Sequence, residues 1–187
     1  MNVTSLTIPD VKLITMKRFG DDRGFFSETF SERALADAGI THSFVQDNHS
    51  LSREVNTVRG LHLQLSPTAQ GKLVRVPRGR ILDVAVDVRR GSPTYGEHVA
   101  VEISSEAWNA IYVPPGFAHG FCTLEPDTEV TYKVTAYYSP ENERGVLWHD
   151  PALNIAWPCD TAKANTSPKD RIYPKLADCE TFFHYDG

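Results

Sequence analysis

The sequence has few cysteines, no long apolar run and no excess of positive charge, and each absence excludes a class of protein. Its three cysteines, Cys122, Cys159 and Cys179, are widely spaced and form no CxxC pair, which argues against a disulfide framework or a structural zinc site and favours free thiols. No run approaches the roughly 20 apolar residues of a membrane span, and the N-terminus lacks the basic start and apolar stretch of a signal peptide. We therefore expect a soluble, cytoplasmic protein that engages no membrane.

The formal net charge of −5 gives no general basic field for a nucleic acid backbone. A local cluster of arginine and lysine can still bind a small anion such as a diphosphate. The 187 residues, of which 41% are apolar and 23% charged, suit a single folded domain covering residues 1–187.

Short β-type runs separated by Gly, Pro, Asp and Ser dominate the chain, and they predict an all-β fold, an antiparallel sandwich or barrel. Alternation is clearest in RILDVAVDV, where Leu82, Val84 and Val86 share a face opposite Asp83 and Asp87, so one face of this strand is expected in a core. The predicted strands are VKLITM, GFFSETF, HSFVQDNHS, TVRGLHLQL, KLVRV, RILDVAVDV, EHVAVEI, NAIYVP, HGFCTL, EVTYKVTAYY and GVLWHD.

Only the segment ERALADA predicts a helix. Ser31 precedes it as an N-cap, and Gly39 stands where a helix commonly ends in a left-handed residue. From Trp157 onward the periodicity is lost, which predicts loops and one short helical turn.

His62 lies within TVRGLHLQL, where strict alternation puts it on one face with Gln64 and puts Arg59 on the other face. Two polar side chains on one face are costly in a dry core, so this face is either solvated or lines a polar cavity. For His62 alone, the solvated face is the better interpretation.

Two further residues favour a polar cavity. Tyr132 is in phase with Val130 and Val134, so its phenol points towards a core and needs a buried partner or a cavity. Lys72 puts a cation at the entrance of the apolar run that follows it, although a lone lysine there is more often a surface residue.

The segment PPGFAHGF, residues 114–121, resembles the second motif of the cupins, which places a histidine on a barrel strand. Metal-binding cupins also carry a His-x-His pair and a later glutamate, whereas this chain reads His62-Leu63-Gln64. Because two histidines bind a transition metal weakly, we expect no metal in this barrel.

A larger set of segments, in order and at matching spacings, is similar to the dTDP-4-dehydrorhamnose 3,5-epimerase family. The similarity covers about residues 8–171 and leaves residues 172–187 as a C-terminal tail. It implies a cupin-type jelly-roll β-barrel with a few short peripheral helices. The matching segments are GDDRGFFSETF, FVQDNHS, VRGLHLQ, QGKLVR, DVAVD, PPGFAHGF, TYKVTAYYSP and SPKD.

The resemblance implies an isomerase that acts on a dTDP-linked 4-keto-6-deoxyhexose in rhamnose biosynthesis and inverts the two carbons beside the ketone. Each inversion removes a carbon-bound proton and returns one to the opposite face, so an enolate must be stabilised between a base and an acid. His62 matches the family's base and Asp170 the carboxylate that orients it, while Tyr132 matches the acid and Lys72 the cation beside the keto oxygen. No cofactor is implied, because the substrate's own ketone serves as electron sink.

The resemblance also implies a set of substrate contacts. Arginine and lysine suit the diphosphate, an aromatic ring suits the base, and amides and carboxylates suit sugar and pyrimidine edges. Tyr138 matches the ring that stacks on thymine. The remaining matched positions are Arg23, Glu28, Gln46, Asn48, Arg59, His119, Glu143 and Lys169. For Glu143 and Lys169, an ordinary surface position is the alternative.

Two further expectations concern the backbone at Gly60 and the assembly of two subunits. Arg59 and His62 can share one site only if the strand is irregular between them, so Gly60 is predicted to form a bulge. The resemblance also implies a homodimer with exchanged N-terminal strands, in which Arg23 and Glu28 serve the partner's pocket.

Three alternatives remain open. Relatives with nearly the same residues epimerise C3 alone or C5 alone. A metal-dependent cupin would need the missing ligand. A non-catalytic sugar-nucleotide-binding cupin should have lost the base, whereas His62, Asp170, Lys72 and Tyr132 are all present.

Overall fold

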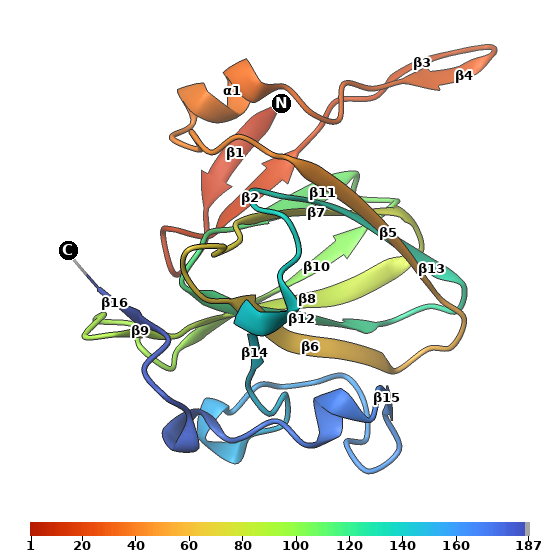
Figure 1. The fold of residues 1–187 in the computed structure, drawn as a ribbon. Helices are drawn as coiled ribbons and strands as arrows, with labels where there is room; N and C mark the ends of the chain where they lie inside the picture. Colours follow the sequence, from red (N-terminus) through yellow and green to blue (C-terminus); the bar gives the residue numbers. More distant parts are fainter. Residues whose placement is uncertain (186–187) are drawn as a thin grey trace.

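Two antiparallel sheets face each other as a barrel in the computed structural model, which describes residues 1–185 (Figure 1). The first sheet has the order β1 (Asn2–Ser5), β2 (Lys12–Thr15), β11 (Asn109–Val113), β7 (Lys72–Arg78), β13 (Thr128–Val134) and β5 (Gln46–Ser52). The second has the order β10 (His98–Ser104), β8 (Arg80–Asp87), β12 (Phe117–Thr123), β6 (Thr57–Gln64) and β14 (Glu143–Gly145), with β15 (Asn165–Thr166) parallel to β6. The predicted all-β jelly-roll fold is confirmed.

Apolar side chains fill one part of the space between the sheets. Val74 and Ile111 of the first sheet, together with Ile81 and Phe121 of the second, belong to one buried cluster. The alternation of strand residues explains this layer, since every second side chain of each strand points inward.

The outer face of the second sheet is also buried. Val84 and Val86 of β8 pack with Trp148 and Leu176 of the C-terminal half. The sequence predicted one core face for this strand, but both faces are covered, and Asp83 and Asp87 lie buried on the inner face.

The predicted helix is confirmed. α1 (Glu32–Asp37) begins after Ser31, whose hydroxyl accepts a hydrogen bond from the Ala34 amide, and Gly39 follows it at φ +85°. Leu35 of α1 packs with Ile14, Ile40 and Leu73 against the outer face of the first sheet.

The C-terminal segment has more structure than the predicted loops with one helical turn. It contains β15, the 3₁₀ turns η3 (Lys169–Arg171) and η4 (Leu176–Asp178), and β16 (Phe183–His184), which pairs with β9 (Arg89–Arg90). Further 3₁₀ turns lie at η1 (Pro140–Asn142) and η2 (Pro151–Leu153). Through Leu176, the C-terminal segment packs on the outer face of the second sheet.

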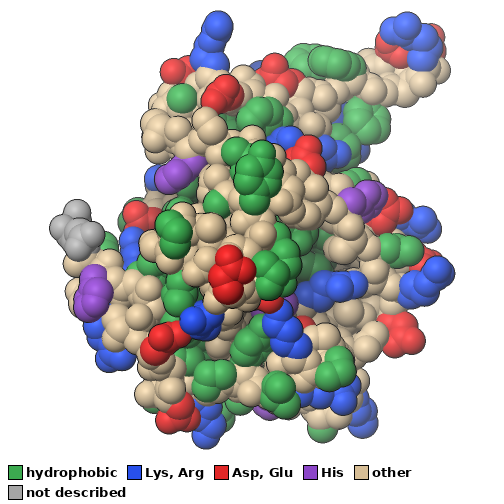
Figure 2. All heavy atoms as spheres, viewed as in Figure 1, with side chains coloured by type: hydrophobic (Ala, Val, Ile, Leu, Met, Phe, Trp, Pro, Cys, Tyr) green, Lys and Arg blue, Asp and Glu red, His purple; other side chains and the backbone are tan. Residues whose placement is uncertain are grey.

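A thin arm leaves the barrel near the N-terminus (Figure 1). It is the hairpin of β3 (Phe19–Asp21) and β4 (Gly24–Phe26), and its three phenylalanines are largely exposed. Charged side chains of both signs gather at its tip (Figure 2). Exposed aromatic rings on a projecting hairpin are typical of a protein contact.

The three cysteines lie within residues 1–185 and are unpaired there. Among the same residues, no helix has the length and apolar character that a membrane crossing requires.

Candidate active site

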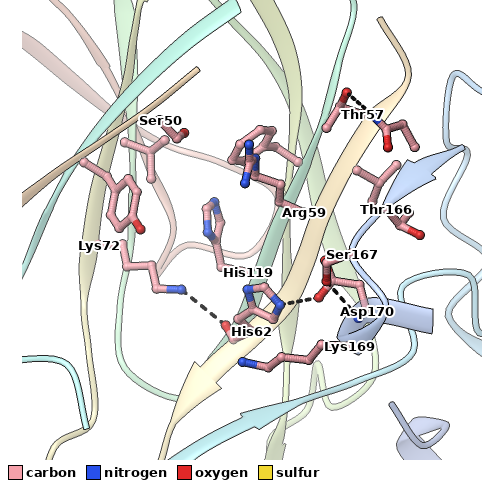
Figure 3. Close-up of a pocket in the computed structure, with 15 residues that line it drawn as sticks. Ser50, Thr57, Arg59, His62, Lys72, His119, Thr166, Ser167, Lys169 and Asp170 are labelled. Carbon is pink, nitrogen blue, oxygen red and sulfur yellow. Dashed lines mark hydrogen bonds and ion pairs between the residues drawn. The ribbon is translucent and has the colours of Figure 1, made fainter. Parts of the chain in front are cut away.

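A cavity of about 520 Å³ opens between the two sheets, and a recess of about 260 Å³ adjoins it. His62, Lys72 and Tyr132 line both. Figure 3 shows polar side chains from β6, β7, β12 and the C-terminal segment converging on this cavity. The cavity is lined by Ser50, Thr57, Val58, Arg59, His62, Lys72, Val74, His119, Phe121, Tyr132, Asn165, Thr166, Ser167, Lys169 and Asp170.

A bulge in β6 turns both Arg59 and His62 into the cavity. His62 pairs with His119 and Arg59 pairs with Phe121, so three steps along β6 face two steps along β12. Gly60 lies in the extra step at φ +122°. The predicted bulge is confirmed, and two interpretations from strict alternation are wrong: that Arg59 faces away from His62, and that His62 lies on a solvated face.

His62 and Asp170 form the closest polar pair in the cavity. His62 Nε2 lies 2.6 Å from Asp170 Oδ1, and the side chains are 30% and 3% exposed, respectively. Burial works against ionisation of Asp170, but hydrogen bonds from His62, Ser167 and the Gly60 backbone, together with the His62 charge, hold its pKa below the usual range. Asp170 is therefore a carboxylate that fixes the orientation of the imidazole.

Lys72 brings a cation to the same cavity. Its Nζ donates a hydrogen bond to the backbone oxygen of His62 at 3.3 Å (Figure 3). Burial lowers the pKa of Lys72 to about 8, against the opposing effect of the Asp83 and Glu143 charges. The ammonium group is thus available at neutral pH but easily deprotonated above it.

Tyr132 lies on β13 in the first sheet, whereas His62 lies on β6 in the second. Burial raises the pKa of Tyr132, Arg59 opposes this rise and Glu143 adds to it. The phenol therefore stays protonated at neutral pH and is a proton donor from the sheet facing His62.

His119 belongs to a second pair of the same type. Its Nε2 lies 2.9 Å and 3.0 Å from the two oxygens of Asp83, which is fully buried on β8. His119 was expected from the sequence, whereas Asp83 was not. The signal for Asp83 is an aspartate between Leu82 and Val84, which must have a partner when buried.

The recess is lined by four of the residues matched to substrate contacts. Gln46 Nε2 donates to Asn48 Oδ1 at 2.8 Å, and both residues line the recess with Tyr138 and Glu143. The Tyr138 hydroxyl donates a hydrogen bond to Glu143 at 3.0 Å, and this bond raises the pKa of Tyr138. Lys169 forms an ion pair with Glu143. The Tyr138 ring is 56% exposed, so its face is open for stacking.

Arg23 and Glu28 do not reach this chain's own cavity or recess. Arg23 lies at the tip of the arm, with its side chain 89% exposed and paired only with Asp21 at 2.6 Å among the described residues. Glu28 is exposed where the arm returns to the barrel.

Several other cavity residues were not predicted, because they carry no distinctive pattern in the sequence. Ser167 receives a hydrogen bond from the Asp170 amide at 3.2 Å, and Ser50, Thr57 and Thr166 are small polar residues of the kind found on any surface. Within residues 1–185 no group of three or more His, Cys, Asp or Glu side chains has an arrangement that could hold a metal ion.

Known proteins similar to this chain in sequence and in structure belong to one enzyme family. Residues 5–178 match the family model of dTDP-4-dehydrorhamnose 3,5-epimerase. The enzyme of that name from Sinorhizobium fredii is 53% identical over 99% of this chain and 94% of its own length. The crystal structure of dTDP-4-dehydrorhamnose 3,5-epimerase from Bacillus anthracis with TDP and pyrophosphate bound has 48% sequence identity and a TM-score of 0.89. The match covers 93% of this chain and 98% of that one.

The crystal structure of dTDP-6-deoxy-D-glucose-3,5-epimerase from Legionella pneumophila in complex with dTDP-4-keto-L-rhamnose has 42% identity and a TM-score of 0.94. It covers 100% of this chain and 99% of that one. Sequence identity at this level over nearly the whole chain, together with the same fold, makes this protein a member of the dTDP-4-dehydrorhamnose 3,5-epimerase family.

Proposed function

We propose that this protein epimerises C3 and C5 of a dTDP-linked 4-keto-6-deoxyhexose, in the route to dTDP-L-rhamnose. The observation that carries the proposal is the His62–Asp170 pair at 2.6 Å, set in a cavity that Lys72 and Tyr132 also line. A base, a cation and a neutral acid are the groups that proton transfer beside a ketone requires.

In the proposed reaction, proton-transfer groups act from the two facing sheets. His62 on one sheet takes the proton from the carbon beside the ketone, and the electron pair moves to the keto oxygen as an enolate. The Lys72 ammonium stabilises that oxygen. Tyr132, on the facing sheet, returns a proton to the opposite face of the carbon, so the carbon is inverted. Tyr132 then regains a proton from solvent and His62 releases the abstracted proton to solvent, so both groups return to their starting states.

The adjoining recess suits the nucleotide. The exposed Tyr138 ring offers a face to thymine, and Gln46, Asn48 and Glu143 offer hydrogen-bonding groups to the base and sugar edges. Arg59, turned inward by the bulge, supplies a guanidinium for the diphosphate, with Lys169 nearby in the same cavity.

A homodimer completes the site in this proposal. Arg23 and Glu28 are matched to substrate contacts, yet they lie on an arm that projects from their own barrel. An exchanged arm would bring them to the partner's cavity and bury the exposed phenylalanines. The cytoplasm is the compartment that suits the three free thiols.

The test is incubation with dTDP-4-keto-6-deoxyglucose in D₂O, following deuterium at C3 and C5 separately. Label at both carbons is expected, label at one carbon identifies a single-site epimerase, and label at neither contradicts the proposal. In the same assay His62→Ala should lose exchange at both carbons while dTDP binding persists, because the base contributes to chemistry more than to affinity.

A further inference from the structure

Tyr173, which neither the sequence motifs nor the cavity lining includes, packs against the His62 imidazole. The two ring centroids are 5.8 Å apart and the ring planes meet at 68°, an edge-to-face contact. Tyr173 follows Asp170 by one short turn, so a single segment brings both of these side chains to the imidazole.

Backbone contacts hold this segment against the sheet on both sides of Tyr173. Before it, Asn165 and Thr166 of β15 pair in parallel with Thr57 and Val58 of β6. After it, the Leu147 amide donates a hydrogen bond to the Pro174 oxygen at 2.8 Å. The tyrosine is therefore anchored through the chain as well as through its ring.

Gly145 provides the space in which the Tyr173 ring lies. Gly145 pairs with His62 across β14 and β6, so it is the direct neighbour of the imidazole-bearing residue. A Cβ atom at position 145 would lie 2.4 Å from both Cε2 and Cζ of Tyr173. Among the standard residues only glycine leaves the ring where it contacts His62.

The Tyr173 hydroxyl does not compete with Asp170 for the imidazole. Its oxygen is shielded from solvent, and Lys169 Nζ lies 5.9 Å from the ring centroid. Burial raises the pKa of Tyr173, and the Lys169 charge opposes this only in part, so the phenol is neutral near pH 7. The imidazole is thus hydrogen-bonded to the Asp170 carboxylate and packed against a neutral aromatic ring, Tyr173.

We propose that Tyr173 is a positioning residue for His62. Its ring, seated on Gly145, holds the imidazole in the plane in which Nε2 meets Asp170 and the other ring nitrogen is left to take the substrate's proton. The inference rests on the proposed function of His62 as the base. A loose imidazole would reach the same geometry only part of the time, and small displacements of a catalytic group lower the rate steeply.

The experiment compares Tyr173→Leu with Tyr173→Phe. Tyr173→Leu removes the ring, and we expect kcat to fall about 10- to 100-fold with KM changed less than about twofold. Tyr173→Phe keeps the ring, and we expect it to recover most of the kcat that leucine loses. Tyr185→Leu is the matched control, since Tyr185 lies in the same tail but packs over Arg89, and it should behave as the unmodified protein.

A second readout follows the imidazole directly. In ¹⁵N NMR spectra His62 should show a single Nε2-protonated tautomer in the unmodified protein and in Tyr173→Phe, and a tautomer mixture in Tyr173→Leu. Calorimetric dTDP binding verifies that each variant is folded. If Tyr173→Leu fails to fold, Gly145→Ala, which displaces the ring without removing it, should give the same loss of kcat and the same mixture.

Two results would overturn the positioning role: a Tyr173→Leu protein with the unmodified kcat and tautomer, or a Tyr173→Phe protein as impaired as Tyr173→Leu. Failure of the proposed function is distinguishable from both. In that case the unmodified protein incorporates no deuterium, and the tautomer spectra alone decide whether Tyr173 positions His62.

Discussion

His119 directs its Nε2 at both oxygens of Asp83, at 2.9 Å and 3.0 Å, from the strand next to the one that carries His62. The cavity therefore contains two histidines, each held by its own buried carboxylate. Register pairing of His62 with His119 places the two imidazoles side by side on the inner face of the second sheet.

Asp83→Asn should lower kcat/KM by about 10- to 100-fold, the effect typical of losing a group that orients a functional histidine. The amide keeps the size of the carboxylate, so the barrel should fold. Because His119 lies beside the proton-transfer groups, dTDP binding, which involves no hexose, should change little. Steady-state kinetics and calorimetry measure the two effects, and an unchanged kcat/KM would show that the pair is purely structural.

Asp170→Asn should cause a larger loss, about 10²- to 10⁴-fold in kcat, because the amide donates where the carboxylate accepts and therefore favours the wrong imidazole tautomer. The measurement is single-turnover deuterium incorporation. Ser167→Ala is a milder control, since Ser167 Oγ accepts from the Asp170 amide at 3.2 Å and its hydrogen bond is one of several that lower the Asp170 pKa. A loss in Ser167→Ala equal to that in Asp170→Asn would contradict the primary role of the carboxylate.

The alkaline side of the pH profile should report Lys72. Burial lowers the pKa of Lys72 to about 8, so the ammonium that stabilises the enolate is lost as pH rises through that value, and kcat should fall above about pH 8. In Lys72→Arg the guanidinium stays charged, so the remaining activity should show no such alkaline limb up to about pH 10. If kcat falls near pH 8 in both proteins, the fall reports the titration of a group other than Lys72.

The same pKa has a consequence for stability. The folded protein binds the Lys72 proton less tightly than the unfolded chain, whose lysines titrate near pH 10.4, so between about pH 8 and pH 10 this group makes the folded state more stable as pH rises. Charged Lys72 is thus retained at a cost to stability. Lys72→Met should raise the midpoint of guanidinium unfolding at pH 7 while reducing deuterium exchange; a lower midpoint would mean that the ammonium is well compensated by Asp83 and Glu143.

Local pattern was sufficient to predict much of this fold. The strands and the Ser31 cap follow from alternation and capping chemistry, which act over a few residues. The inward turn at Gly60 was predicted only because the family resemblance placed Arg59 and His62 in one site, against strict alternation. The positions of His62, Lys72 and Tyr132 in one cavity needed the family resemblance, because strict alternation alone favoured a solvated His62.

The remaining features depend on contacts between distant segments. Asp83 looks like an exposed residue of an alternating strand until the barrel closes around it and His119 becomes its partner. Tyr173 lies in a segment without periodicity, and only the packing of that segment on Gly145 and His62 gives it a role. A short-range pattern can indicate that a buried aspartate needs a partner, but it does not identify that partner.

Gly60→Ala should destabilise the fold by about 2–5 kcal/mol, because it combines backbone strain with a steric clash. Gly60 adopts φ +122°, and an added Cβ would lie 2.6 Å from Gly120 Cα and 2.7 Å from the His119 oxygen. Gly91→Ala is the matched control, with φ +90° but no atom within 4 Å of the new Cβ, and it should cost only about 1 kcal/mol. Denaturant unfolding compares the two, and equal losses would show that the bulge has room to adjust.

The exchanged arm predicts complementation between two impaired variants. Arg23→Ala should weaken the partner's site through loss of a guanidinium contact, and His62→Ala inactivates its own. When the two are unfolded together and refolded, about half of the dimers are mixed, and each mixed dimer contains one site with both an intact His62 and an intact Arg23. Half of the dimers are mixed and half of the sites in each mixed dimer are intact, so activity should return to about a quarter of the unmodified level. If the arm serves its own barrel instead, every site lacks one residue and the mixture stays as inactive as its parts.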